Sequence, residues 1–388
     1  MKDKEYALVL EGGGTRGAYQ VGVWKAIKEL GIKIKAISGT SIGSLNGALI
    51  LQDDLESMIK LYENIEIKNI MEISNEIDQT KNLFDIVNVR KVASDIIENK
   101  GIDNTPLRKT IEQYIDIDKI YNSEIDFGLV TYSVKNKMPI QLFKKDIPKE
   151  NMVDYLLASS CFPIFKAQKI GEEEFLDGAF YENTPINMIV EKGYKNIIVA
   201  CINGIGFRKK IIDKNVYLKI IAPKENLGGS FEFNHEKIKN NITLGYLDTM
   251  RSFNKMQGHM YYFFSDEFNK MLEVFNLQTI YGLENAAKIY KMDKYKPYTF
   301  EEFIKELSKR HLDAKEKYTN LKSKFHVKYF PEFKGKINTI YNGGMGICFV
   351  MDIYTDKPMS KKFAYLKNFI QDYLESVEAL LELENYMK

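Results

Sequence analysis

A serine flanked by glycines is the first feature of the sequence that could do chemistry. Five residues form the motif: Gly39, Thr40, Ser41, Ile42 and Gly43. A nucleophilic serine has to project from a sharp strand-to-helix turn, and glycines two residues to either side leave room for that turn. An apolar, strand-like segment (32–37) precedes the motif and an apolar helical segment (45–51) follows it. We therefore interpret Ser41 as a candidate nucleophile.

A glycine-rich loop follows the first apolar run of the chain, residues 6–10. Its residues are Gly12, Gly13, Gly14, Thr15, Arg16 and Gly17. Consecutive glycines let several backbone N–H groups point at one anion, and the start of the next helix adds positive potential. Acyl transfer needs such donors for the oxyanion of its tetrahedral intermediate. We expect Gly12, Gly13, Gly14 and Gly17 to build this oxyanion hole, with Arg16 adding charge or holding the loop in shape.

The same loop also fits the G-x-G-x-x-G pattern of dinucleotide-binding proteins, through Gly12, Gly14 and Gly17. Such a protein would carry an acidic residue at the end of its second strand, to hold the ribose. Here the second apolar segment runs into Ser38 and the Ser41 motif instead. No Gly-Lys-Ser/Thr follows the loop either, so it is not a P-loop. A nucleotide site is therefore not expected.

Two kinds of residue could act as the base for Ser41. Ser-His-Asp hydrolases place their histidine late in the chain, and the four histidines all lie in the second half: His235, His259, His311 and His326. Among these histidines, His235 is the least implausible candidate for such a base. The alternative is Asp177, which ends an apolar run and is followed by Gly178, where the chain can turn. A carboxylate in a partly dry site gains proton affinity and can take the serine proton directly.

The elements around these residues predict an α/β protein with a mostly parallel sheet. Helices are expected at 18–30, 45–51 and 153–160, and strands at 6–10, 32–37, 127–132, 139–143, 197–202 and 216–222. From about residue 256 the sequence favours helices, including an amphipathic one at 361–388, with a strand or turn at 340–351. We expect one domain over 5–255 that holds the site, and a mostly helical region over 256–388 packed on it.

Composition narrows the remaining possibilities. The 55 basic and 53 acidic residues nearly balance, which argues against a nucleic-acid partner. Three scattered cysteines suit a reducing compartment. Neither a signal peptide nor a membrane-spanning segment is evident, so a cytoplasmic protein is expected, with peripheral membrane contact as a possibility. The basic run 208–210 is interpreted as a solvated loop.

Taken together, these motifs resemble the patatin-like phospholipase family. That family combines a Gly-Gly-Gly-x-Arg/Lys-Gly loop, a Gly-x-Ser-x-Gly turn and an Asp-Gly-Gly/Ala segment in this order, and Ala179 completes the last of them here. Three further stretches are also similar to it: 104–108, 158–165 and 183–185, the last beginning at Asn183. The resemblance is close over about 5–202 and looser as far as 245–249.

The resemblance implies a three-layer α/β/α fold and a Ser41–Asp177 dyad without histidine, with Gly178 and Asn183 in support. It further implies hydrolysis of lipid acyl esters, of the phospholipase A or lysophospholipase type, with neither metal nor organic cofactor. Two alternatives stay open. The chain could be an esterase or acyltransferase on small soluble esters, or a non-catalytic module that binds lipid or protein.

Overall fold

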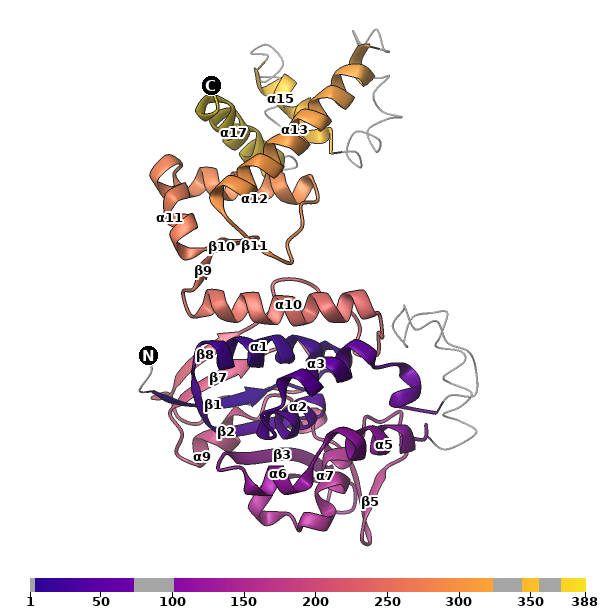
Figure 1. The fold of residues 1–388 in the computed structure, drawn as a ribbon. Coiled ribbons are helices and arrows are strands. Elements are labelled where there is room, and N and C mark those ends of the chain that lie inside the picture. The colour runs from indigo at the N-terminus through magenta and orange to yellow at the C-terminus, as the bar shows by residue number, and fades with distance from the viewer. Residues whose placement is uncertain (1–3, 73–100, 324–343, 356–370) are drawn as a thin grey trace. The chain divides into compact units, whose positions relative to one another are not determined.

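The fold is seen in a computed structural model, which describes residues 4–72, 101–323, 344–355 and 371–388 (Figure 1). The chain divides into two compact units, Met1–Ser252 and Phe253–Lys388. The first unit contains Ser41, Asp177 and the glycine loop. No described helix has both the length and the apolar character needed to cross a bilayer.

The first unit alternates strands and helices along most of its length. Its strands are β1 (Glu5–Leu10), β2 (Lys33–Thr40), β3 (Asp126–Ser133), β4 (Met138–Phe143), β5 (Gln168–Ile170), β6 (Glu173–Asp177), β7 (Asn196–Ala200) and β8 (Tyr217–Ile221). Its helices are α1 (Ala18–Glu29), α2 (Ile42–Leu51), α3 (Leu55–Asn64), α5 (Thr105–Tyr114), α6 (Ile117–Asn122), α7 (Met152–Ser159), α8 (Ala179–Glu182), α9 (Ile186–Glu191) and α10 (His235–Ser252). The strands and helices that the sequence predicts in this unit are confirmed, with ends shifted by a few residues.

The strands of this unit form one sheet in the order β5-β6-β3-β2-β1-β7-β8. The run from β3 to β8 is parallel, whereas β4, β5 and β6 pair antiparallel. Helix α9 packs on the face that carries Ala7, Val9 and Val199. Helix α2 lies on the opposite face, where its Gly47 approaches Ile37 and Phe127. The predicted three-layer α/β/α architecture is therefore present.

Strand β3 aligns the two strand ends that carry the candidate nucleophile and base. Val130 pairs with Thr40, the residue before Ser41, and the next residue, Thr131, pairs with Asp177. Since β4 pairs with the same stretch of β3, it must occupy the other edge. β2 and β6 therefore follow each other along one edge of β3 and run toward each other. Their ends meet there, which brings two residues distant in sequence together.

Helices α1 and α10 approach each other through glycines. A Cβ atom on Gly22 of α1 would lie 1.8 Å from the Ile242 carbonyl oxygen, and one on Gly245 would lie 1.9 Å from that of Tyr19. Tyr19 also donates a hydrogen bond of 2.7 Å to the buried carboxyl of Asp248. Close contact between the two backbones thus requires glycine at both positions.

The second unit is mainly helical, as predicted. It contains α11 (Ser265–Val274), α12 (Leu277–Ile289), α13 (Phe300–Ser323), α15 (Gly346–Thr355) and α17 (Gln371–Tyr386). A small sheet that the sequence did not reveal joins β9 (Met256–Gln257), β10 (Tyr262–Phe264) and β11 (Pro297–Tyr298). Of the strand or turn expected at 340–351, a turn is present at Gly344 and Met345, whereas the strand is wrong because Gly346 begins a helix. Residues 340–343 and the first part of the expected helix 361–388 lie outside the described residues.

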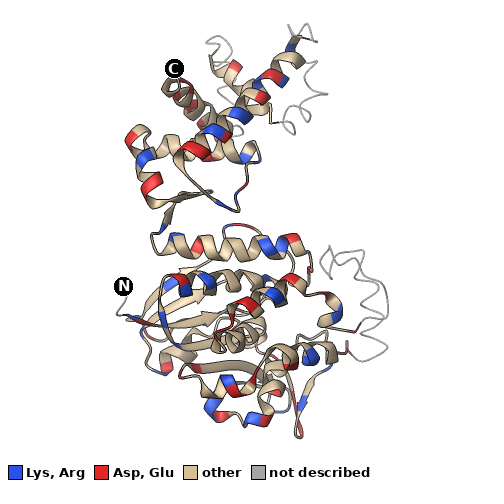
Figure 2. Cartoon of the chain, viewed as in Figure 1, with Lys and Arg blue, Asp and Glu red and all other residues tan. Residues whose placement is uncertain are grey.

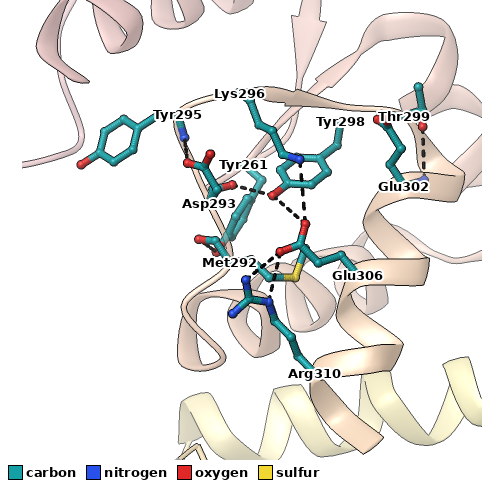
Figure 3. A network of polar contacts seen from close by, with 10 residues as sticks. All are labelled: Tyr261, Met292, Asp293, Tyr295, Lys296, Tyr298, Thr299, Glu302, Glu306 and Arg310. Carbon is teal, nitrogen blue, oxygen red and sulfur yellow. Dashed lines mark hydrogen bonds and ion pairs between the residues drawn. The ribbon is translucent and has the colours of Figure 1, made fainter. Parts of the chain in front are cut away.

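A network of polar contacts fixes the start of α13 in this unit (Figure 3). The Tyr298 hydroxyl donates to the Asp293 carbonyl oxygen at 2.7 Å, and Glu306 accepts two hydrogen bonds from Arg310. Thr299 and Glu302 exchange side-chain and backbone hydrogen bonds, which is the capping box that begins a helix. All of these contacts lie within the second unit and stabilise it.

Replacement of Gly245 by alanine should destabilise the first unit, because the added methyl group would press on the Tyr19 carbonyl. Overpacking of this kind costs roughly 1–3 kcal/mol. Thermal unfolding followed by circular dichroism measures the effect, with Lys239→Ala on an exposed position of α10 as the matched control. Equal unfolding temperatures for Gly245→Ala and the wild type would show that the helices are not in backbone contact.

Candidate active site

Ser41 stands at the turn between β2 and α2 in a strained backbone conformation. Its φ of 55° and ψ of −130° lie outside the usual regions for a residue with a side chain, and such strain costs of order 1–3 kcal/mol. A Cβ on Gly39 would lie 2.3 Å from the Gly43 backbone, and one on Gly43 would lie 2.2 Å from the Leu10 carbonyl oxygen. The turn therefore needs both glycines. Its geometry is that of a nucleophile elbow.

Hydrogen bonds hold the elbow against the segments around Asp177. Ser41 donates its N–H to the Ser159 hydroxyl at 3.1 Å, a contact that sequence reasoning missed. The Thr40 hydroxyl donates to the Glu182 carbonyl oxygen at 2.8 Å, and the Ser38 hydroxyl donates to that of Pro185 at 2.9 Å. Helix α2 begins directly after, at Ile42, whose side chain lines the same cavity as Ser41.

Asp177 is completely enclosed by protein at the end of β6. Its N–H donates to the Cys161 carbonyl oxygen, and its Oδ1 accepts from the Ala179 N–H, both at 2.8 Å. Gly178 is needed between them, since a Cβ there would lie 2.5 Å from the Val130 carbonyl oxygen. The other carboxyl oxygen, Oδ2, is buried without a well-formed hydrogen bond. Asp177 thus keeps one oxygen available for a proton.

Burial raises the pKa of the Asp177 carboxyl to about 7, and the hydrogen bond from the Ala179 N–H and the nearby Ser41 hydroxyl oppose this rise. A carboxyl with such a pKa is half ionised near neutral pH. It is also a far stronger base than an ordinary aspartate, while still able to give the proton back. The protein environment thus suits Asp177 to exchange protons with Ser41.

Two glycines of the glycine loop line the cavity. Gly12 donates its N–H to the Asn183 carbonyl oxygen at 3.1 Å, so this amide is already engaged. Gly13 and Gly14 line the cavity, and their N–H groups donate to no acceptor in the described part of the chain. Gly17 lies further on, away from the cavity, with its carbonyl oxygen bound by Asn46. The expected oxyanion donors therefore narrow from four glycines to Gly13 and Gly14.

Arg16 and Thr15 fasten this loop to the segment before α10. The Arg16 guanidinium donates to the Gly228 carbonyl oxygen at 2.7 Å and also to that of Asn203. Thr15 binds Gly229 through its hydroxyl and Ser230 through its N–H. Of the two roles expected for Arg16, the contacts support holding the loop in shape.

Glu11 is a buried carboxylate directly before the glycine loop, and the sequence analysis overlooked it. Glu11 is fully buried and accepts hydrogen bonds from the Ile202 N–H at 2.6 Å, the Thr184 hydroxyl at 3.2 Å and Arg208 at 2.5 Å. Arg208 is exposed, as expected for a solvated loop at 208–210, but its guanidinium also pairs with this buried carboxylate. Lys209 likewise lies 3.6 Å from the buried Glu182. The position of Glu11 directly after an apolar strand could have indicated a buried carboxylate in the sequence.

Asn183 couples the glycine loop to the segment after Asp177. Its Nδ2 donates to the Gly12 carbonyl oxygen at 3.1 Å, and its backbone N–H donates to that of Phe207 at 2.7 Å. Its Oδ1 is buried without a partner and would lie 2.4 Å from a Cβ on Gly12. The same Cβ would lie 3.1 Å from Ser41 Cβ, so Asn183 and Ser41 are close neighbours. The supporting position expected for Asn183 matches these contacts.

The candidate active site is a cavity of about 150 Å³, whose lining is mostly apolar. Ser41, Asp177, Asn183, Gly13 and Gly14 line its polar part. Its apolar part comprises Ile42, Leu45, Ile65, Ile70, Leu107, Phe162, Phe165, Ile205, Phe231 and Phe233. None of the histidines is among its described lining residues, and His235 instead contacts the Glu63 carbonyl oxygen at 2.9 Å.

Comparison with known proteins agrees with the motifs. Residues 8–190, just under half of the chain, match the family described as patatin-like phospholipase. The matched residues include Ser41, Asp177 and the glycine loop between β1 and α1.

Similarity to individual curated proteins is confined to short stretches. A 50-residue stretch is 58% identical to lysophospholipase nte1 of Aspergillus terreus, covering 13% of this chain and 3% of that protein. A 54-residue stretch is 48% identical to patatin-like phospholipase domain-containing protein 6 of Homo sapiens, covering 14% and 4%. The chain thus matches only a few per cent of the length of these relatives.

Two solved structures were also found. VipD from Legionella pneumophila is 14% identical, with a TM-score of 0.42 and coverage of 98% of this chain and 87% of that chain. The type III effector protein ExoU is 11% identical, with a TM-score of 0.33 and coverage of 97% and 78%.

Any reaction that needs ionised Asp177 should follow its pKa of about 7. Below pH 7 the carboxyl is protonated, so kcat/KM should fall about tenfold per pH unit, and it should level off above pH 8. Rates on a soluble ester between pH 5 and 9 measure this.

Because the pKa is raised from 3.8, Asp177 stabilises the fold at low pH and loses this contribution as the pH rises through 7. Protonation of Asp177 should therefore lower the activity in acid without unfolding the protein. A kcat/KM that stays constant down to pH 5 would contradict the role of Asp177 as the base.

Proposed function

We propose that the chain is a serine hydrolase of lipid acyl esters, of the phospholipase A or lysophospholipase type, with a Ser41–Asp177 dyad. The observation that supports this most is the shared cavity, which is lined by a strained serine, by a buried carboxyl with a pKa of about 7, and by Gly13 and Gly14. The match of residues 8–190 to the patatin-like phospholipase family supports the same chemistry.

In the first half-reaction, Asp177 Oδ2 takes the proton of the Ser41 hydroxyl as Ser41 Oγ attacks the ester carbonyl carbon. The negative charge that develops on the carbonyl oxygen is bound by the N–H groups of Gly13 and Gly14. Loss of one such donor typically costs about 3 kcal/mol of transition-state stabilisation. The tetrahedral intermediate then expels the alcohol, which leaves with the proton held on Asp177. An acyl-enzyme remains on Ser41.

In the second half-reaction, water attacks the acyl carbon and gives a proton to Asp177. The intermediate collapses, the fatty acid leaves, and Ser41 recovers its proton from Asp177. The raised pKa suits both directions of transfer, because the carboxyl is neither too weak a base to accept the proton nor too strong to return it. Neither half-reaction requires a histidine.

Exposed apolar side chains at the mouth of the cavity favour a lipid surface as the source of substrate. Ile205 lines the cavity and is 71% exposed, and Phe207 and Phe180 are 67% and 46% exposed. Phe207 and Ala179 are joined by a backbone hydrogen bond of 3.1 Å, so the loop 205–207 lies beside α8. Basic and acidic residues are otherwise interspersed along the drawn helices (Figure 2). We infer peripheral contact with lipid through this mouth.

The dyad predicts that Ser41→Ala and Asp177→Asn each lose at least about 10³-fold in kcat, because one removes the nucleophile and the other the base. Turnover of a short nitrophenyl ester measures this, and a fluorophosphonate probe should label the wild type at Ser41. Ser57→Ala, on α3 and outside the cavity lining, is the matched control. Wild-type turnover in folded Ser41→Ala protein would refute the proposal, and an unlabelled, inactive wild type would favour a binding module.

The lipid-facing mouth predicts that Phe207→Asp loses about tenfold in rate on phospholipid vesicles, because a charge replaces an apolar contact. Its rate on a short soluble ester should not change. Ile220→Asp, at an equally exposed position on β8 that does not line the cavity, is the control. If the wild type cleaves soluble esters but not vesicle phospholipid, the esterase alternative holds instead.

A further inference from the structure

A second cavity extends the candidate active-site cavity away from Ser41. The two share six residues: Ile42, Leu45, Tyr62, Ile65, Ile70 and Leu107. The second encloses about 40 Å³ between α2, α3 and α5, and it reaches past Leu49 and Leu61 to Ile111 and Tyr114. Because the shared residues form walls of both, the two cavities are neighbours along α2.

The second cavity offers an occupant almost no hydrogen bonds. No Asp, Glu, Lys or Arg is among its described lining residues. The Asn46 amide donates to Gly17 and Gln20, and it accepts from the Tyr62 hydroxyl at 2.8 Å. The Thr110 hydroxyl donates to the Asn69 carbonyl oxygen at 2.8 Å. Since these polar groups are already satisfied within the protein, the space favours hydrocarbon over a polar ligand.

The first cavity is polar near Ser41, in contrast to the apolar second cavity. Ser160 Oγ, Asp177 Oδ2 and Asn183 Oδ1 are buried, line the first cavity and form no hydrogen bond in the described structure. Unsatisfied buried polar atoms are rare in proteins and are expected where a polar ligand or water binds. The two neighbouring cavities therefore have a polar end at Ser41 and an apolar end beyond Leu45. An ester group followed by a hydrocarbon chain has the same polarity.

We propose that the second cavity binds the acyl chain of the substrate, and that Leu61 and Thr110 limit the chain length it accepts. This inference rests on the proposed function, because the acyl carbonyl must lie at Ser41 for the chain to enter along Ile42 and Leu45. Each methylene group that enters an apolar site gains about a fourfold factor in binding, which corresponds to ~0.8 kcal/mol. Long acyl chains should thus be preferred over short ones.

Two variants fill the cavity from different helices. Thr110→Phe on α5 and Leu61→Trp on α3 replace partly exposed residues, so each larger side chain can be accommodated without disrupting the core. Neither residue lines the cavity at Ser41. Gln113→Phe is the matched control, because it adds the same ring to an exposed position of α5 outside the cavity lining. Circular dichroism establishes that all three proteins are folded.

Two measurements are made on each protein: kcat/KM for nitrophenyl butyrate and nitrophenyl decanoate, and binding of decanoate by calorimetry. The wild type and Gln113→Phe should prefer the decanoyl ester and bind decanoate. Thr110→Phe and Leu61→Trp should lose at least about tenfold on the decanoyl ester and in decanoate affinity, which corresponds to about two lost methylene contacts. Their butyryl rate should stay within about twofold of the wild type.

The binding measurement separates this inference from the proposed function. Weaker decanoate binding in both variants supports the acyl-chain site, even if no protein turns over either ester and the proposed hydrolysis fails. Unchanged decanoate binding and an unchanged preference in both folded variants would overturn the inference while leaving the hydrolase intact. Equal losses on butyryl and decanoyl esters, with decanoate binding unaffected, would also overturn it, because they indicate a general disturbance.

Discussion

The pairing register of one strand determines whether this fold can carry a reactive site. β3 pairs with the end of β2 at Val130 and with the end of β6 at Thr131, on the same edge. A slip of one residue in either pairing would turn the affected side chains to the other face of the sheet. The side chains of Ser38 and Thr40 reinforce the register, since their hydroxyls bind the backbone at Pro185 and Glu182. The candidate nucleophile and the carboxyl are thereby placed by paired strands and buried hydrogen bonds.

The same burial that activates the carboxyl has an electrostatic cost, and the protein handles its two buried acids differently. Glu11 is surrounded by donors and paired with Arg208, so its charge is compensated and it serves to hold the glycine loop. Asp177 has one N–H on Oδ1 and no close cation among its pKa determinants, so burial dominates and raises its pKa. A compensated carboxylate stabilises structure, whereas an undercompensated one is reactive. Strain at Ser41 is a second local cost, accepted where the backbone is held on both sides by glycine contacts.

The sequence predicted well what local patterns determine. Apolar runs and glycines located β1, β2 and the elbow, because steric demands at Gly39 and Gly43 act over a few residues. The meeting of Ser41 with Asp177 was not derivable from spacing, since it depends on the register of β3, and it was predicted only through the family resemblance. The ion pair of Glu11 with Arg208 was missed because a charge pattern does not reveal a partner far along the chain. The two- and three-residue strands β9–β11 are too short to show an alternating pattern, and the glycines before α15 were mistaken for an interruption.

The most direct test is a crystal structure of the protein after reaction with a fluorophosphonate. The account predicts phosphorus bonded to Ser41 Oγ and a phosphonyl oxygen about 3 Å from the N–H groups of Gly13 and Gly14. The Asp177 carboxyl should face the same oxygen of Ser41, with no other side chain between them. Phosphorus on a different residue, or a histidine interposed between Ser41 and Asp177, would contradict it.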